Sequence, residues 1–123
     1  MTTIAKIDKN SGNLQIEIII GYAQQGRYKI RLWDKDRRNP KVVGEGVNWD
    51  EIADTFDLGP ANKLINKTLS WDVIVTALQS KSGQFYCVTV ILKQKGKPVE
   101  GGIFQESGPL EGSKGIFGLR TLV

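Results

Sequence analysis

Hydrophobic and polar residues alternate with a period of two along four long stretches of the chain. In an extended backbone this places the apolar side chains on one side and the polar ones on the other, which predicts half-buried β-strands. The four stretches are residues 13–22, 27–34, 69–78 and 84–93. Weaker strands are expected at residues 3–8, 42–45, 99–105 and 116–123.

Short polar links that contain glycine separate these stretches. They are Asn10-Ser11-Gly12-Asn13, Gln24-Gln25-Gly26, Lys81-Ser82-Gly83 and Lys95-Gly96-Lys97. Links of this length join antiparallel strands, because a parallel crossover needs about a dozen residues or more. We therefore expect an all-β fold, an antiparallel β-sandwich or barrel of about 7–8 strands. The 123 residues contain no repeat or linker, so residues 1–123 are predicted to form a single β-sandwich domain.

One segment has a helical rather than a strand-like pattern. Asn48 is a suitable N-cap, and Gly59-Pro60 would end the helix. Apolar residues between them recur at positions i, i+3, i+4 and i+7, namely Trp49, Ile52, Ala53 and Phe56. The spacing predicts one short α-helix at about 49–57, packed over one end of the sheet.

The stretch at 84–93 is apolar on both sides. Tyr86, Val88 and Val90 share one side, and Phe85, Cys87, Thr89 and Ile91 occupy the other. Either the predicted helix covers the second side, or that side is an exposed apolar patch used for self-association. In both cases Cys87 is expected to be a small buried apolar residue rather than a reactive thiol.

The composition excludes several kinds of chemistry. The chain has no His and a single Cys, so it has no Ser-His-Asp triad, no His-ligated metal and no intrachain disulfide. No pair of carboxylates stands out in a glycine-rich loop, so we expect no catalytic residues and no enzyme activity. The catalytic alternative is a hydrolase that works with carboxylates alone, for which Asp50, Asp54 and Asp57 are the nearest set.

Charge is distributed unevenly along the chain. Seventeen Lys and Arg against thirteen Asp and Glu give a net charge of +4. Residues 26–45 hold seven cations and three anions, whereas residues 46–72 hold two cations and five anions. The alternation along residues 27–34 places the three cations of this predicted strand on its outward side, together with Trp33. The candidate ligand- or partner-binding residues are Arg27, Lys29, Arg31, Trp33, Arg37 and Arg38.

This pattern favours a non-catalytic binding module that presents a basic face and loops to a protein partner or to other copies of itself. Duplex nucleic acid is disfavoured as a partner, because the net charge is small and acidic residues lie close by in the sequence. A second interpretation is a domain that recognises carbohydrate or the headgroups of anionic lipids. Exposed Trp33 or Trp49 would then be the platform on which the ligand stacks.

The segment from residue 32 to residue 45 carries a family resemblance. Leu32-Trp33-Asp34-Lys35-Asp36-Arg37, followed by Val42-Val43-Gly44-Glu45, resembles the calcium-loop region of the calcium- and phospholipid-binding β-sandwich domains of protein kinase C and synaptotagmin. The same run is similar to transthyretin-like sandwiches. The first resemblance implies a membrane site at the loop end of a sandwich, with Asp34 and Asp36 as calcium ligands. Pro40-Lys41 stands where that family has a further Asp. We expect no other cofactor.

No stretch of the sequence approaches the length of about 18 apolar residues that a membrane-spanning helix needs, so no transmembrane segment is expected. The first residues lack the basic and apolar regions of a signal peptide. The expected location is therefore cytoplasmic, although a secreted protein stripped of its leader would show the same pattern.

Overall fold

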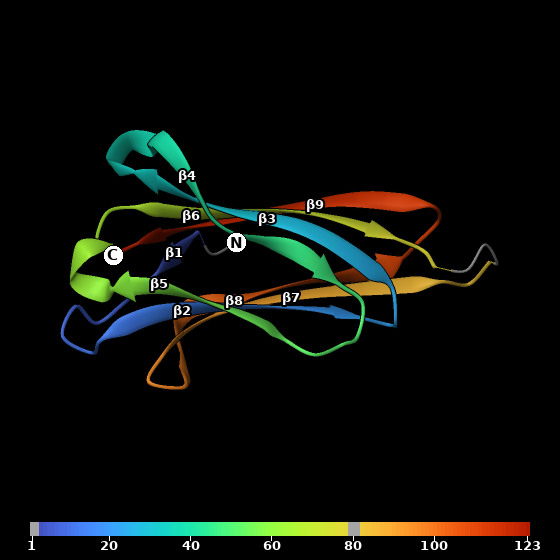
Figure 1. The fold of residues 1–123 in the computed structure, drawn as a ribbon, viewed down its shortest axis with the longest axis horizontal. Helices are drawn as coiled ribbons and strands as arrows, with labels where there is room; N and C mark the ends of the chain where they lie inside the picture. The colour runs from blue at the N-terminus through green and yellow to red at the C-terminus, as the bar shows by residue number, and fades with distance from the viewer. Residues whose placement is uncertain (1–2, 79–81) are drawn as a thin grey trace.

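Two β-sheets lie face to face, and the alternating apolar side chains fill the space between them (Figure 1). The structure is a computed structural model that describes residues 3–78 and 82–123. In spatial order, the five-stranded sheet consists of β1 (Ile4–Ala5), β9 (Ser113–Leu122), β6 (Thr68–Thr76), β3 (Gln25–Asp34) and β4 (Arg38–Asn48). The four-stranded sheet consists of β5 (Asp54–Pro60), β2 (Asn13–Gly21), β7 (Phe85–Gln94) and β8 (Lys97–Pro109).

These nine strands confirm the predicted all-β sandwich and exclude the barrel alternative, because the two sheets are separate. Every ladder is antiparallel except the short one between β1 and β9. Two single-turn 3₁₀ segments, η1 (Lys35–Arg37) and η2 (Ala61–Lys63), interrupt the strands. In the described part of the chain, no helix has the length and hydropathy that are needed to cross a lipid bilayer.

The inward positions predicted from the period of two are the buried ones. Leu14, Ile16, Ile18 and Ile20 of β2 are fully buried. Burial of each such side chain stabilises the fold by about 1.5–3 kcal/mol. The other three strongly alternating strands contribute the remaining central residues of the core, which are Tyr28, Ile30, Leu69, Trp71, Val73, Val75, Tyr86, Val88, Val90 and Leu92.

The glycine-containing links do not all form hairpins. Lys95 and Gly96 adopt positive φ angles and connect β7 directly to β8, as expected. The link at 24–26 instead carries the chain from β2 in one sheet to β3 in the other. Buried Gln24 ties this corner to β7, because its amide nitrogen donates to the Phe85 carbonyl at 3.0 Å. Of the predicted turn at 81–83, Lys81 lies outside the described residues.

The predicted helix at about 49–57 is wrong. The segment instead forms a loop followed by β5, which pairs with the edge of β2 and ends at Pro60. Local hydrogen bonds shape the loop: the Asn48 side chain donates to the Ile52 carbonyl at 2.6 Å, and Ile52 N–H donates to Asp50 at 3.0 Å. A helix of two or three turns is marginal without tertiary support, whereas pairing with β2 satisfies the backbone of β5. The part of β7 that faces outward therefore has no helix over it.

A hydrogen bond joins the two sheets on the side where β4 and β5 are the outer strands. The Tyr28 hydroxyl of β3 donates to the Asp54 carboxylate of β5 at 2.6 Å. Burial, with this hydrogen bond to an acid, raises the pKa of Tyr28 well above its ordinary value. Phe56 packs edge-on against the Tyr28 ring, with ring centroids 6.0 Å apart.

On the opposite side, the N-terminal segment crosses from one sheet to the other. Thr121 N–H of β9 donates to the Thr3 carbonyl at 2.7 Å, and Lys6 N–H donates to the Glu100 carbonyl of β8 at 2.9 Å. This crossing covers only one end of the side between β8 and β9, since β1 pairs with β9 only at Thr121 and Leu122.

Two glycines of β9 offer a matched test of core packing. Gly118 lies opposite Trp71 in the ladder, and a Cβ atom on Gly118 would overlap the indole ring, whereas one on Gly115 would meet no atom within 4 Å. We expect Gly118→Ala to lower the free energy of unfolding by about 1–3 kcal/mol. Gly115→Ala should cause no loss. Urea denaturation measures both, and equal effects of the two substitutions would contradict this account of the core.

Asp57 provides a test of acid stability. Asn13 Nδ2 lies 3.1 Å from each of its carboxylate oxygens, and Gly59 N–H donates to it at 2.8 Å. These bonds lower the pKa of Asp57 below its ordinary value of 3.8. The stabilisation is therefore present above that value and is lost as the pH falls through the lower, folded-state pKa. Asp57→Asn and Asn13→Ala should both reduce the fall of the urea midpoint between about pH 5 and about pH 2. Curves parallel to that of the wild type would refute the assignment.

Candidate functional site

The outward side of the five-stranded sheet carries most of the residues that the sequence singled out. Here it is called the outer face, and it is built from cross-strand rows. In the register between β3 and β6, Arg27 lies opposite Ile74, Lys29 opposite Asp72, Arg31 opposite Ser70, and Trp33 opposite Thr68. On the β4 side, Val47 lies next to Arg27, and Glu45 lies next to Lys29. On the β9 side, Phe117 lies next to Asp72, and Leu119 lies next to Ser70.

Two of the three cations on β3 are paired with acids from other strands. Arg31 Nη1 lies 2.6 Å from Asp72 Oδ2, and Lys29 Nζ lies 3.8 Å from Glu45 Oε2. Each such exposed pair contributes about 0–1 kcal/mol to stability, but it removes most of the local excess of positive charge. The basic face expected along β3 is therefore largely neutralised, because the register brings anions of β4 and β6 against it.

Exposed apolar side chains stand among the polar ones in these cross-strand rows. Val47, Ile74 and Phe117 have 44%, 53% and 57% of their surface exposed, and they come from three different strands. Arg27 lies between Val47 and Ile74, in an open groove of about 590 Å³. None of these three apolar residues was predicted from the sequence. Single outward-facing apolar residues on strands far apart in the sequence give no signal until the register aligns them.

Trp33 lies on the outer face, as predicted, but it is not a free platform. Its indole N–H donates to Ser70 Oγ at 2.9 Å, and the side chain is half-buried. A small pocket of about 180 Å³ lies beside the ring, lined also by Arg37, Phe117 and Leu119. The hydrogen bond fixes the ring against β6, so a ligand would meet the ring in one defined orientation.

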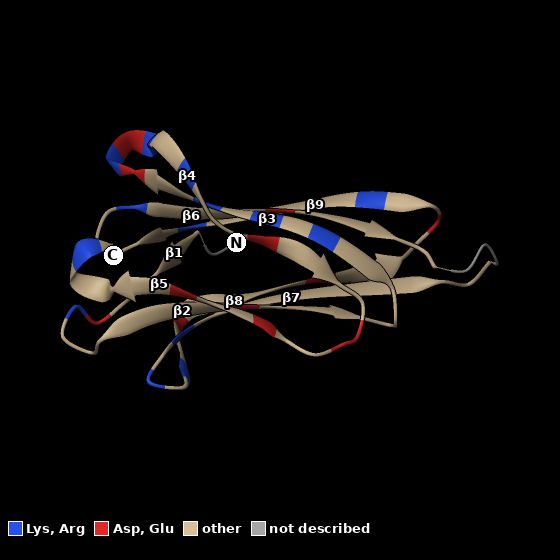
Figure 2. Cartoon of the chain, in the orientation of Figure 1, with Lys and Arg blue, Asp and Glu red and all other residues tan. Residues whose placement is uncertain are grey.

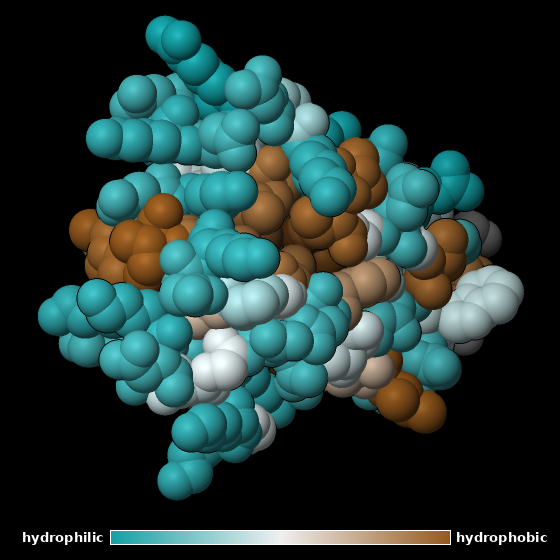
Figure 3. Space-filling model, turned by 60° about the vertical axis from the view of Figure 1, so that its left-hand side comes forward, coloured by the Kyte–Doolittle hydropathy of each residue, from teal (hydrophilic) through white to brown (hydrophobic). Residues whose placement is uncertain are grey.

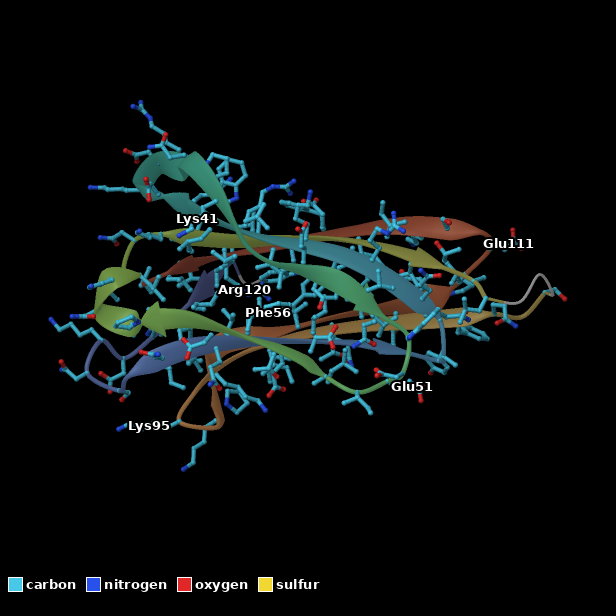
Figure 4. The ribbon with its side chains drawn as sticks, in the orientation of Figure 1. Lys41, Glu51, Phe56, Lys95, Glu111 and Arg120 are labelled. Atoms are coloured by element: carbon cyan, nitrogen blue, oxygen red, sulfur yellow. The ribbon has the colours of Figure 1, made fainter. Side chains whose placement is uncertain are left out.

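Positive charge is concentrated where the β3–β4 hairpin projects above the sheet (Figure 2). Arg37 and Arg38 lie here with Lys35 and Lys41, and both arginines are thus at the end of the outer face. The apolar surface at this end of the molecule lies between hydrophilic projections (Figure 3). Acidic residues gather separately along β5 and the loop before it (Figure 2). Figure 4 shows Lys41 on the hairpin and Glu51 on that loop, both toward the periphery.

The two predicted calcium ligands, Asp34 and Asp36, lie in this hairpin. Asp34 Oδ1 is 3.4 Å from Lys67 Nζ, and Asn39 Nδ2 donates to its other oxygen at 3.3 Å. Within residues 3–78 and 82–123, no three His, Cys, Asp or Glu side chains are grouped so as to hold a metal ion. The calcium site remains a prediction that rests on the resemblance.

The acids considered for a carboxylate mechanism have structural roles. Asp54 accepts the Tyr28 hydroxyl, Asp57 accepts Asn13, and Asp50 closes the loop before β5. Each carboxylate is thus already hydrogen-bonded within the fold. The expectation of no enzymatic activity remains a prediction.

The second apolar surface lies on the four-stranded sheet. Phe85 of β7 and Ile103 of β8 are 50% and 56% exposed, and Cys87 is partly exposed on the same side. Of the two explanations for the apolar character of β7, the exposed patch applies, because the predicted covering helix is absent. Cys87 is therefore more accessible than the sequence predicted.

The anchor of Trp33 can be tested directly. Ser70→Ala removes the acceptor of the indole N–H, which then lacks a partner at a half-buried position. We expect a loss of about 0.5–1.5 kcal/mol in the free energy of unfolding and a change in Trp emission. Ser113→Ala, which removes one hydroxyl of an exposed pair with Thr76, is the control and should have almost no effect. No difference between the two variants would show that the hydrogen bond does not hold the ring.

Comparisons of the chain with family models, with curated proteins and with solved structures found no match. What the structure establishes is therefore the two-sheet sandwich, and any function has to be argued from its surface.

Proposed function

We propose that the protein is a non-catalytic binding module that docks a protein partner on the outer face. The observation that carries this proposal is the set of exposed apolar side chains Val47, Ile74 and Phe117 on one sheet surface. Arg27 lies between Val47 and Ile74, and Arg37 of the β3–β4 hairpin lines a pocket with Phe117. A sheet surface that only faces water normally carries polar residues at such positions. Apolar residues beside a charged rim are typical of protein interfaces.

The charges indicate what kind of partner would fit. Lys29 and Arg31 are paired with acids of the same sheet, so their charges would attract a partner only weakly. They would serve mainly to fix its orientation. Arg27, Arg38 and Lys41 form no ion pair within the described residues and lie along the groove and the hairpin. The complementary surface is an apolar patch flanked by carboxylates, which would be attracted to the hairpin before the apolar residues meet.

Photo-crosslinking tests the proposal at a chosen position. Benzoylphenylalanine would replace Ile74 at the centre of the outer face. In the control it would replace Gln105, which is exposed on the four-stranded sheet. In an extract of the source cells, we expect a discrete adduct with another protein from position 74 and none from position 105. Equal labelling from both positions, or no adduct, would refute the outer face as the docking surface. An adduct with the same chain would assign it to self-association.

Charge reversal distinguishes specific docking from apolar stickiness. Arg27→Glu combined with Arg38→Glu should lower the yield of the adduct roughly threefold or more, because like charges would then face the partner. Lys95→Glu is the control, since it makes one such charge change in the distant β7–β8 turn (Figure 4). An unchanged yield in the double variant would contradict an acidic partner.

A second candidate is the recognition of a sugar or of an anionic lipid headgroup at Trp33. The pocket beside Trp33 and Arg37 favours it, and the resemblance of residues 32–45 to calcium- and phospholipid-binding domains implies a calcium-assisted form. Binding to a glycan array and to phosphatidylserine vesicles, each with calcium and with a chelator, would test it. We expect Trp33→Ala to abolish any such binding, and absence of binding by the wild type in all four conditions would remove this candidate.

A further inference from the structure

Arg120 occupies a position that the outer face does not explain. It lies on the inward side of β9, only 7% exposed, between the two sheets (Figure 4). Its guanidinium carbon is 5.8 Å from the centre of the Trp71 ring and 5.9 Å from that of Phe104. A cation therefore lies inside an aromatic part of the core.

No acid neutralises this cation. The Arg120 side chain donates to three backbone carbonyls, Gly101 at 2.9 Å, Leu119 at 2.8 Å and Ile103 at 3.2 Å. Within the described residues, no carboxylate comes within ion-pair distance of it. Burial lowers the pKa of Arg120, but its ordinary value is so far above neutrality that the side chain stays charged. A buried charge without a counter-ion is unfavourable, and a guanidinium has five N–H donors, of which these bonds use three.

A second donor without a partner lies next to it. Trp71 is 1% exposed, and its indole nitrogen has no hydrogen-bond partner in the protein. The nitrogen lies against Gly118, because a Cβ atom on that residue would overlap it. Among the described residues, two donor groups thus meet on the inward side of β9, and no carboxylate is paired with either of them.

This part of β9 borders an open cleft of about 660 Å³ between β8 and β9. The cleft exists because β1 pairs with β9 only at Thr121 and Leu122, which leaves the preceding edge uncovered within the described residues. Phe104 lines it from the inward side of β8, the outward-facing Phe117 and Ile103 lie at its rim, and its cations are Arg37 and Arg120. The one acid, Glu106, already accepts the Tyr86 hydroxyl at 2.9 Å.

We propose that this cleft binds a small amphipathic carboxylate, with its head at Arg120 and its alkyl or aryl body against Phe104 and Phe117. The head supplies the counter-ion that the buried guanidinium lacks, through charge-assisted hydrogen bonds. The aromatic walls bury the body, and the volume suits a small-molecule site. Glu106 disfavours a second negative charge on the ligand, which selects a monoanion over a phosphate dianion.

The probe for the test is 1-anilinonaphthalene-8-sulfonate, a fluorescent monoanion with an aryl body. We expect saturable binding at one site, and displacement by decanoate or by 1-naphthaleneacetate. The neutral alcohols of the same size, decanol and 1-naphthaleneethanol, should compete at least about tenfold more weakly, because they lose the charge-assisted bonds. The two acids distinguish an alkyl from an aryl ligand. Absence of saturable binding, or equal competition by acids and alcohols, would overturn the proposal.

Substitution of Arg120 tests the proposed contact. Arg120→Met should weaken binding of the probe about tenfold or more, whereas Arg27→Met, the same charge change on the outer face, should leave it unchanged. Thermal unfolding checks that both variants fold. Ile103→Glu is a second variant, at an exposed position on the rim of the cleft, and should also weaken binding because it adds a negative charge. Folded Arg120→Met with the affinity of the wild type would refute the site.

Nuclear magnetic resonance gives a readout that does not depend on Arg120. Addition of decanoate to the wild type should shift the indole N–H signal of Trp71 more than those of Trp33 and Trp49, since the Trp71 ring lies against Gly118 and Phe104, which both line the cleft, whereas Trp33 lines the neighbouring pocket. Phe substitutions of Trp33 and Trp49 assign the signals. A larger shift at Trp33 would overturn the proposed location.

Discussion

The packing of β2 and β7 against β3 and β6 is the contact on which the rest of the molecule depends. Each of these four strands has a neighbour on both sides within its sheet, and the inward residues of all four are almost fully buried. The chain has one cysteine and therefore no intrachain disulfide to support it. The interlayer core must hold the fold, and every surface feature is placed by the strands that form it.

The two sides of the sandwich, where the sheet edges face each other, are closed in different ways. On the side of β4 and β5, the neutral phenol of Tyr28 donates to the Asp54 carboxylate, so these two groups satisfy each other. On the side of β8 and β9, Arg120 bridges to the backbone of β8, and its charge has no protein counter-ion in the described residues. Because of this asymmetry, the proposed anion site lies on the side of β8 and β9.

The outer face shows how a sheet redistributes charge. A basic segment and an acidic segment of the sequence become neighbours, and their side chains pair across strands as Arg31 with Asp72 does. The remaining positive charge lies on Arg27, between Val47 and Ile74, and on the β3–β4 hairpin. An interface with an apolar centre and a charged end is consistent with docking of a protein partner, which is the function proposed above.

The sequence by itself determined the fold class and the core, because the period of two is a local property that any extended strand converts into an inner and an outer side. It placed Arg27, Lys29, Arg31 and Trp33 on the outward side of β3 for the same reason. The tertiary structure alone decided which strands became neighbours. Hence Asp72 neutralises Arg31, Phe117 lies in the row next to that of Ile74, and Arg120 has no acid paired with it among the described residues. It also decided the structure of residues 49–57. There the edge of β2 pairs with β5, and the helical spacing of Trp49 and Phe56 gives no sign of that pairing. Such outcomes depend on contacts between residues far apart in the chain, and no local pattern encodes them.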